Sequence, residues 1–150
     1  METPTKDTIE SRLNAAILCF LANDLHLLEI RASERAMCHK LAEYIQQLFR
    51  SWHVDCEYNR ADKVPKKLLK VKDSTESRSV FPDIIVHRRG TTENCLVLEA
   101  KCCDIGKAQE ELDRNKLELY LNEINYHYGV FVTFVIKEPY NVKYEIILKG

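Results

Sequence analysis

Two strongly apolar segments in the second half of the chain constrain its fold most. The first, residues 80–88, contains the run Ile-Ile-Val, and the second, residues 95–102, contains the run Leu-Val-Leu. The residues between them include Gly90, Thr91 and Asn94, which favours a hairpin turn. Strands that are apolar on both faces are typical of a sheet that is covered on both sides. The pattern therefore predicts a hairpin in a sheet with two buried faces.

The rest of the chain changes between helical and extended patterns. Apolar residues that recur at steps of three and four predict amphipathic helices, the second of them opened by Ser33 as N-cap. Residues 23–29 are expected to form only a short connection. Alternating apolar and polar residues predict strands. The order predicts an α/β fold with helices at 6–22, 33–50 and 106–122 and strands at 52–58, 80–88, 95–102, 129–136 and 142–149.

Composition narrows the class of protein. The chain has 150 residues, 45% of them hydrophobic and 30% charged, which fits one domain over 1–150 that buries its own core. It lacks a run of about 18 apolar residues and a signal-peptide layout at its start, so we expect a cytoplasmic protein without membrane contact. The six cysteines lack the Cys-x-x-Cys spacing of zinc sites. We expect most of them to be reduced core residues.

Charged side chains interrupt the two apolar strands at one place. Glu99 and Lys101 are two residues apart in the second strand, so both leave the same face of the sheet, and Leu96, Leu98 and Ala100 take the other face. A hairpin that is symmetric about Thr91 places Asp83 directly across from Glu99. Two carboxylates and an ammonium group are therefore expected to meet at one point of the sheet.

A divalent cation would resolve the repulsion between two carboxylates held together. Mg²⁺, or Mn²⁺ in its place, prefers oxygen ligands, and Asp83, Glu99 and the carbonyl of Ala100 offer them. Lys101 beside the ion is suited to hold an attacking water and to stabilise a phosphorus transition state. The alternative is structural: Glu99 and Lys101 form a surface ion pair, and Asp83 ends a turn after Pro82.

The segments Phe81-Pro82-Asp83 and Glu99-Ala100-Lys101 together resemble the signature of the PD-(D/E)XK nuclease superfamily. The resemblance implies a restriction-endonuclease-like αβββαβ core over residues 31–150, with a central mixed sheet flanked by helices and residues 1–30 as an N-terminal helical addition. It implies that Asp83 and Glu99 bind Mg²⁺, that Lys101 is the catalytic lysine, and that the protein is a metal-dependent endodeoxyribonuclease. It also raises the expectation of a homodimer.

Two helical positions have weaker signals. The resemblance implies that Glu34 completes the metal site; the alternative is an acid that stabilises the first turn of a helix. Asp113, Lys116 and Tyr120 lie along one side of the third helix. The resemblance implies that Lys116 contacts a phosphate and that Tyr120 packs beneath it. The alternative is that Asp113 and Lys116 form a surface pair beside a core tyrosine.

Basic residues indicate nucleic acid as the partner, although the net charge is only −1. Residues 60–79 carry an excess of Lys and Arg, and two arginines approach the hairpin turn. Such side chains contact phosphates without reading sequence. A second hypothesis is therefore a catalytically inactive nucleic-acid-binding or assembly subunit with the nuclease fold. Besides Lys116, the expected contacts to nucleic acid are Arg60, Lys63, Lys66, Lys67, Arg88 and Arg89.

Overall fold

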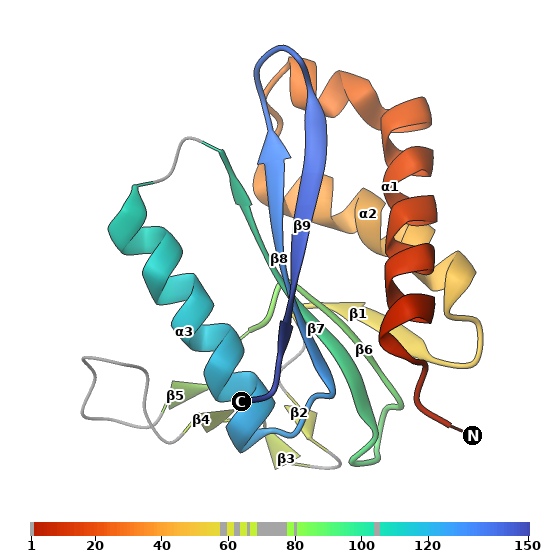
Figure 1. Cartoon of the computed structure of the whole chain (residues 1–150), viewed down its shortest axis with the longest axis vertical. Helices are drawn as coiled ribbons and strands as arrows, with labels where there is room; N and C mark the ends of the chain where they lie inside the picture. Colours follow the sequence, from red (N-terminus) through yellow and green to blue (C-terminus); the bar gives the residue numbers. More distant parts are fainter. Residues whose placement is uncertain are drawn as a thin grey trace.

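A five-stranded sheet lies between helices in the computed structural model, which describes residues 2–57, 60–61, 64–65, 67–68, 78–79, 81–103 and 106–150. The helices α1 and α2 lie on one side of the sheet and α3 on the other (Figure 1). The elements are α1 (Lys6–Glu29), α2 (Glu34–Leu48), β1 (His53–Cys56), β2 (Arg60–Ala61), β3 (Val64–Pro65), β4 (Lys67–Leu68), β5 (Arg78–Ser79), β6 (Ile84–His87), β7 (Asn94–Cys102), α3 (Lys107–Glu123), β8 (Tyr128–Val135) and β9 (Asn141–Leu148).

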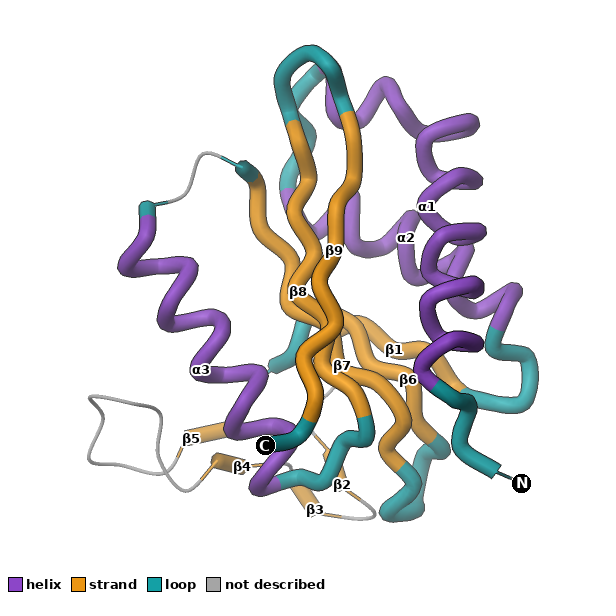
Figure 2. The backbone as a smooth tube through the Cα atoms, viewed as in Figure 1, coloured by secondary structure: helices purple, strands orange, loops and turns teal. Residues whose placement is uncertain are grey.

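The sheet is mixed, with the strand order β1-β6-β7-β8-β9. Neighbouring strands are antiparallel except β7 and β8, which are parallel. Parallel strands need a long crossover, and α3 supplies it here. Figure 2 shows β2 to β5 as short segments apart from the main sheet. The predicted mixed α/β class is thus confirmed.

The hairpin of β6 and β7 forms the middle of this sheet and is buried on both faces, as the apolar runs predict. Side chains of Ile84, Leu96 and Leu98 pack in the core that α1 and α2 cover. Ile85 and Val97 point to the opposite face and pack with residues of α3. Because neighbouring strand residues alternate between faces, the next odd-numbered positions of β7 also face α3.

The register of the hairpin agrees with symmetry about Thr91. Ile84 pairs with Leu98, and Ile85 pairs with Val97. The register shifts only near the turn, between Val86 and His87, where β7 has a bulge that leaves the pairs farther along the strands in place. Continuing the main register by one residue brings Asp83 opposite Glu99.

The first helix is longer than its sequence pattern predicts. The expected connection at 23–29 is wrong, because α1 continues to Glu29 through a kink at Asp24 with φ −127° and ψ 21°. Asp24 accepts a hydrogen bond from the Tyr44 hydroxyl of α2, and Leu28 is fully buried beyond the kink. A satisfied polar group and a continued apolar stripe thus extend the helix. Within the described residues, no helix combines the length and apolarity that crossing a bilayer requires.

The expectation of reduced core cysteines is confirmed in part, because all six are free and four lie in the core or pack against it. Cys38 and Cys95 are buried, whereas Cys19 and Cys56 are exposed and the remaining two are intermediate. Cys56 ends β1, which is an edge strand with only β6 beside it. A half-buried strand pattern does not distinguish an edge strand from a central one, and so the exposure of Cys56 was not predictable from the alternation.

Candidate functional site

Asp83 lies directly before β6, where the chain enters the sheet. Its Oδ2 accepts a hydrogen bond of 2.7 Å from the backbone N–H of Ala100 in β7. Its backbone carbonyl accepts a second one, of 3.3 Å, from the N–H of Glu57. The preceding Pro82 is buried and has a fixed φ, so the backbone is restrained on that side as well. The carboxylate of Asp83 is therefore held against β7, beside Glu99, as the register predicts.

Glu99 is a buried carboxylate on the face of the sheet that α3 covers. Only 3% of the residue is exposed, and its Oε1 accepts a hydrogen bond of 3.2 Å from the hydroxyl of Tyr120. Burial raises the pKa of Glu99 well above its usual range, and the neighbouring charge of Asp83 raises it further. A buried strand acid of this kind is not a surface ion-pair residue, so the structural alternative is wrong for Glu99.

The carboxyl groups of Asp83 and Glu99 form a coupled pair. Burial also raises the pKa of Asp83, against the lowering effect of its hydrogen bond to Ala100. A hydrogen bond between the two carboxyl groups contributes to the pKa of each residue. Because two adjacent carboxylates repel one another, the pair retains a proton more readily than an isolated carboxylate does. A cation bound between the two carboxylates would remove this repulsion.

Lys101 follows on the same face of β7 and is surrounded by acids. Its Nζ lies 3.6 Å from Oδ2 of Asp113, and 21% of its side chain is exposed. Burial alone would lower the pKa of Lys101, but the charge of Asp113, followed by those of three other carboxylates, raises it. Lys101 is therefore held as an ammonium group beside the carboxyl pair, where the sequence places it.

The side of α3 that faces the sheet contributes more contacts to the candidate site than the sequence indicates. Asp113 and Lys116 form the pair that the structural alternative predicts, beside the buried Tyr120, but Asp113 is fully buried and so the pair does not lie on the surface. Lys116 Nζ lies 3.5 Å from Oδ1 of Asp113, and Gln109 Nε2 donates to the same carboxylate at 3.3 Å. The spacing of residues 113, 116 and 120 indicated a common side, but not that this side faces Glu99 and Lys101.

Glu34 reaches the same end of β7 from the other side of the sheet. Ser33 caps α2 by accepting a hydrogen bond of 3.1 Å from the N–H of Ala36, and this places Glu34 in the first turn. The Oε2 of Glu34 accepts a hydrogen bond of 3.1 Å from the backbone N–H of Cys102. Glu34 therefore ties the start of α2 to the end of β7, in addition to any favourable effect on the helix itself.

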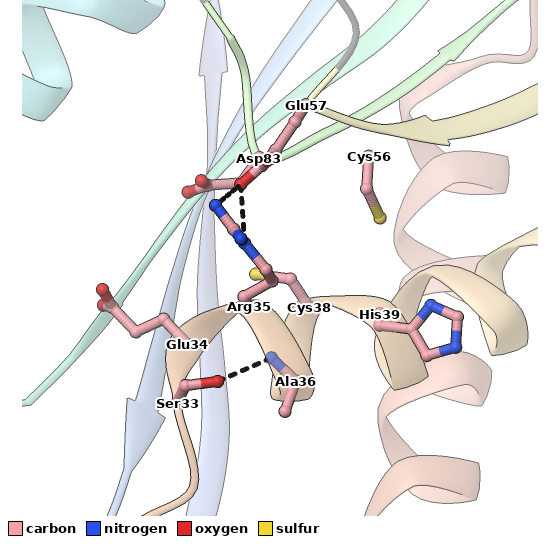
Figure 3. Close-up of a pocket in the computed structure, with 9 residues that line it drawn as sticks. All are labelled: Ser33, Glu34, Arg35, Ala36, Cys38, His39, Cys56, Glu57 and Asp83. Carbon is pink, nitrogen blue, oxygen red and sulfur yellow. Dashed lines mark hydrogen bonds and ion pairs between the residues drawn. The ribbon is translucent and has the colours of Figure 1, made fainter.

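A cavity of about 680 Å³ opens beside Asp83 and Glu34 (Figure 3). Arg35 and Glu57 form an ion pair of 3.1 Å at its rim, with 80% of the Arg35 side chain exposed. Sequence reasoning did not identify Arg35, because a single arginine in the first turn of a helix gives no signal. The cavity is lined by Ser33, Glu34, Arg35, Ala36, Cys38, His39, Cys56, Glu57 and Asp83.

The ionisable side chains around the pair include more acids than lysines. We name these acids and lysines the carboxylate–lysine cluster. When every member is ionised, the four acids and two lysines leave an excess of two negative charges. One divalent ion would neutralise this excess. Its oxygen donors are of the type that Mg²⁺ prefers. The cluster comprises Glu34, Asp83, Glu99, Lys101, Asp113 and Lys116.

The full ligand set expected from the resemblance does not form in the described part of the chain. Among those residues, no group of three or more His, Cys, Asp or Glu side chains is arranged so that it could hold a metal ion. Asp83 and Glu99 meet as a pair, while Glu34 bonds to Cys102 and does not complete a group of three with them. The donors fit a cation that is bound by two carboxylates, with the other positions left to water and substrate.

Two arginines predicted to contact nucleic acid make contacts within the protein, beyond the other end of β6. The Arg88 guanidinium lies 3.7 Å from the centre of the Trp52 ring and also pairs with Glu93 at 3.0 Å. Arg89 Nε donates to Oδ2 of Asp55 at 2.9 Å. Since β6 separates them from Asp83, the structure does not bring these arginines to the carboxylate–lysine cluster.

The other predicted nucleic-acid contacts lie in the basic segment 60–79. Lys63 and Lys66 are outside the described residues, and only the backbone strands of Arg60 and Lys67 are described.

Comparisons of the chain with protein-family models, with curated proteins and with solved structures found no match. The functional interpretation therefore depends on the geometry of the carboxylate–lysine cluster.

Proposed function

We propose that the chain is a metal-dependent nuclease that hydrolyses phosphodiester bonds in DNA. One observation carries the proposal: Asp83 and Glu99, two acids from neighbouring strands, form a coupled and largely buried carboxyl pair with Lys101 beside it. A protein core has no structural need for such a pair, because keeping two carboxylates together away from water is unfavourable. Binding of a cation and of a phosphate would account for the arrangement.

The residues divide the work of hydrolysis between them. Asp83 and Glu99 would hold the ion, which when bound supplies polarisation of the phosphate and a lower pKa for a coordinated water. Lys101 donates from its ammonium group to the attacking water or to a phosphate oxygen, where negative charge increases in the transition state. Tyr120 orients Glu99 through its hydrogen bond to Oε1.

The fold we propose is the restriction-endonuclease-like αβββαβ core. The elements α2, β1, β6, β7, α3 and β8 follow one another in this order, and the mixed sheet with one parallel pair supports the assignment. Helix α1 would be the N-terminal addition and β9 an added edge strand. DNA as the substrate follows from the resemblance, as do Mg²⁺ or Mn²⁺ as cofactor and a possible homodimer. A cytoplasmic location stays a prediction from the sequence.

The test is hydrolysis of DNA by the wild type and by Lys101→Ala. Both are incubated with plasmid, linear, single-stranded and branched DNA, with Mg²⁺ or Mn²⁺ and with EDTA. We expect metal-dependent cleavage by the wild type and a loss of at least about 100-fold in Lys101→Ala, the lower end of the range for the loss of one donor that stabilises charge in a transition state. Lys107→Ala, which removes an exposed lysine at the start of α3, is the matched control. Equal activity of Lys101→Ala and wild type would contradict the proposal.

A second candidate is the catalytically inactive nucleic-acid-binding or assembly subunit. The observation that favours it is the lack, among the described residues, of a group of three side chains suited to a metal ion. Isothermal titration with Mn²⁺ separates the candidates. Heat of binding that Asp83→Asn and Glu99→Gln remove supports the nuclease, whereas DNA binding without any metal heat supports the inactive subunit.

A further inference from the structure

The cavity beside Asp83 and Glu34 has no role in the hydrolysis proposed above. Asp83 of the carboxyl pair lines it, whereas Glu99 and Lys101 do not, and it extends between α2 and the edge strand β1, so that His39 and Cys56 lie on the side away from Glu34 (Figure 3). Its volume of about 680 Å³ lies within the range of small-molecule sites, roughly 300–1,000 Å³. A group attached to a phosphate at the metal centre would therefore have room beside it.

The charges along this cavity disfavour a second phosphate. Among the described residues that line it, three are acids, Glu34, Glu57 and Asp83, and one is an arginine, Arg35, which is paired with Glu57 at 3.1 Å. A phosphate that entered would meet an excess of negative charge. A neutral group does not incur this repulsion, so the electrostatics select against the backbone of a nucleic acid and permit its bases.

The remaining lining suits a flat, neutral ring. Ala36, Cys38 and Cys56 contribute small, weakly polar side chains, and cysteine packs as a small hydrophobe. Ser33 and His39 add polar atoms: the Ser33 oxygen caps α2 and His39 Nε2 pairs with Glu43 at 2.9 Å, so the Ser33 O–H and His39 Nδ1 are the atoms able to pair with the edge of a base. An apolar surface with a few polar groups is the usual composition of a site that binds an organic ring.

We propose that this cavity binds the nucleobase next to the scissile phosphodiester, so that the substrate is a DNA strand with an unpaired nucleotide at the cleavage point. The inference rests on the proposed nuclease function and adds its substrate class. A base in an intact duplex is stacked and paired, and it must leave the stack to enter a pocket. Single strands, flaps and unpaired junctions present such a base without that cost.

The experiment uses a DNA single strand in which every linkage except one is a phosphorothioate, which directs cleavage to one phosphodiester. In matched strands, a tetrahydrofuran abasic analogue replaces the nucleotide on the 5′ side or on the 3′ side of that linkage. A fully paired duplex of the same sequence is the third substrate. Cleavage of the end-labelled strands by the full chain is followed on gels with Mn²⁺, and kcat/KM is compared.

We expect the abasic analogue on one side to reduce kcat/KM about tenfold, as the loss of one bound base does, and the duplex to be cleaved more slowly than the single strand. Ala36→Trp fills the cavity, and the ratio between the base-containing and the abasic strand should fall to about one. Lys40→Trp adds the same side chain to α2 outside the cavity lining and should keep the ratio of the wild type.

The outcomes separate the inference from the function on which it rests. Equal cleavage of base-containing and abasic strands by the wild type overturns the base pocket but leaves the nuclease in place. A tenfold ratio that persists in Ala36→Trp, with thermal melting that shows a folded variant, also overturns it, because the base then binds elsewhere. Cleavage of no strand under conditions in which the chain is folded and Mn²⁺ is bound overturns the pocket and the nuclease together.

Discussion

The carboxylate of Asp113 lies 3.6 Å from the ammonium group of Lys101, although Asp113 itself is fully buried in the middle of α3. The same carboxylate lies 3.5 Å from Lys116 and accepts a hydrogen bond from Gln109. A buried acid that joins two lysines fixes the position of both. Asp113 is therefore a positioning residue for Lys101 in the proposed reaction.

Asp113→Asn should reduce kcat for DNA cleavage by about 10- to 100-fold, in the range seen when a group that orients an active-site residue is lost. The asparagine retains the size of the side chain but not its charge, so Lys101 loses the partner that places it. KM for DNA should change little. Steady-state kinetics of a fluorescent DNA substrate measure both constants. Glu118→Gln, an exposed acid on the same helix, is the control, and a changed KM with normal kcat would count against the assignment.

Glu99→Gln should make the metal-free protein more stable at neutral and higher pH. The pKa of Glu99 is raised in the folded state, so its contribution to stability is full below the pKa of the unfolded chain and is lost as the pH rises toward the folded pKa. In the wild type, the free energy of unfolding falls by about 1.4 kcal/mol for each pH unit between the unfolded and the folded pKa of Glu99. Glutamine does not titrate, so the variant does not lose this stability.

Urea unfolding of wild type and Glu99→Gln between pH 5 and pH 8, in EDTA, checks this prediction. The difference in the free energy of unfolding should grow in favour of the variant as the pH rises. A glutamate that stayed ionised throughout this range would give a difference that is independent of pH, and the coupled carboxyl pair would then be wrong.

Most of the fold was predictable because its signals are local. Ser33 as N-cap, the helix on 107–123 and the two apolar strands of the hairpin depend on periodicity and turn residues that neighbouring positions reveal. The end of α1 was not predictable. There the helix continues because the Tyr44 hydroxyl of another helix bonds to Asp24 and because Leu28 is buried, and both are tertiary contacts.

The candidate site likewise contains features that local sequence patterns predict and features that depend on tertiary contacts. The convergence of Asp83, Glu99 and Lys101 followed from strand alternation and hairpin register, which are short-range rules. The burial of Asp113 and the cavity that contains Arg35 depend on how helices pack on a sheet. Neither helix orientation nor cavity shape is encoded in a local pattern, and so these two features appear only in three dimensions.

Mn²⁺ should stabilise the protein more at pH 8 than at pH 6. The coupled pair must release its proton before it binds a cation, so binding becomes stronger as the pH rises. At a concentration of 100 times Kd, bound Mn²⁺ adds about 2.7 kcal/mol to the free energy of unfolding. Thermal melting with and without Mn²⁺ measures the effect. It should vanish in Asp83→Asn and persist in Glu118→Gln; a shift that survives in Asp83→Asn would place the ion elsewhere.

Asp55→Asn should destabilise the fold without altering the proposed site. Asp55 accepts a hydrogen bond from Arg89 Nε at 2.9 Å and pairs at 2.7 Å with the buried His87, which lies at the end of β6 farther from Asp83. Burial by itself would raise the pKa of Asp55, but the bonds to Arg89 and then to His87 lower it. The stability that these bonds provide is therefore present above the pKa of the unfolded chain and is lost as the pH falls through the folded pKa.

We expect Asp55→Asn to lower the free energy of unfolding at pH 7 by about 1 to 3 kcal/mol, the usual value for hydrogen bonds to a charged group. Below about pH 4 the aspartate of the unfolded chain becomes protonated, so the difference from the variant should begin to decrease there and should vanish only as the pH falls through the lowered folded pKa. Urea unfolding of both proteins at pH 7 and pH 3.5 measures this change. A difference of the same size at both pH values would show that the asparagine acts through packing, because the loss of a charge interaction cannot persist once the charge is gone.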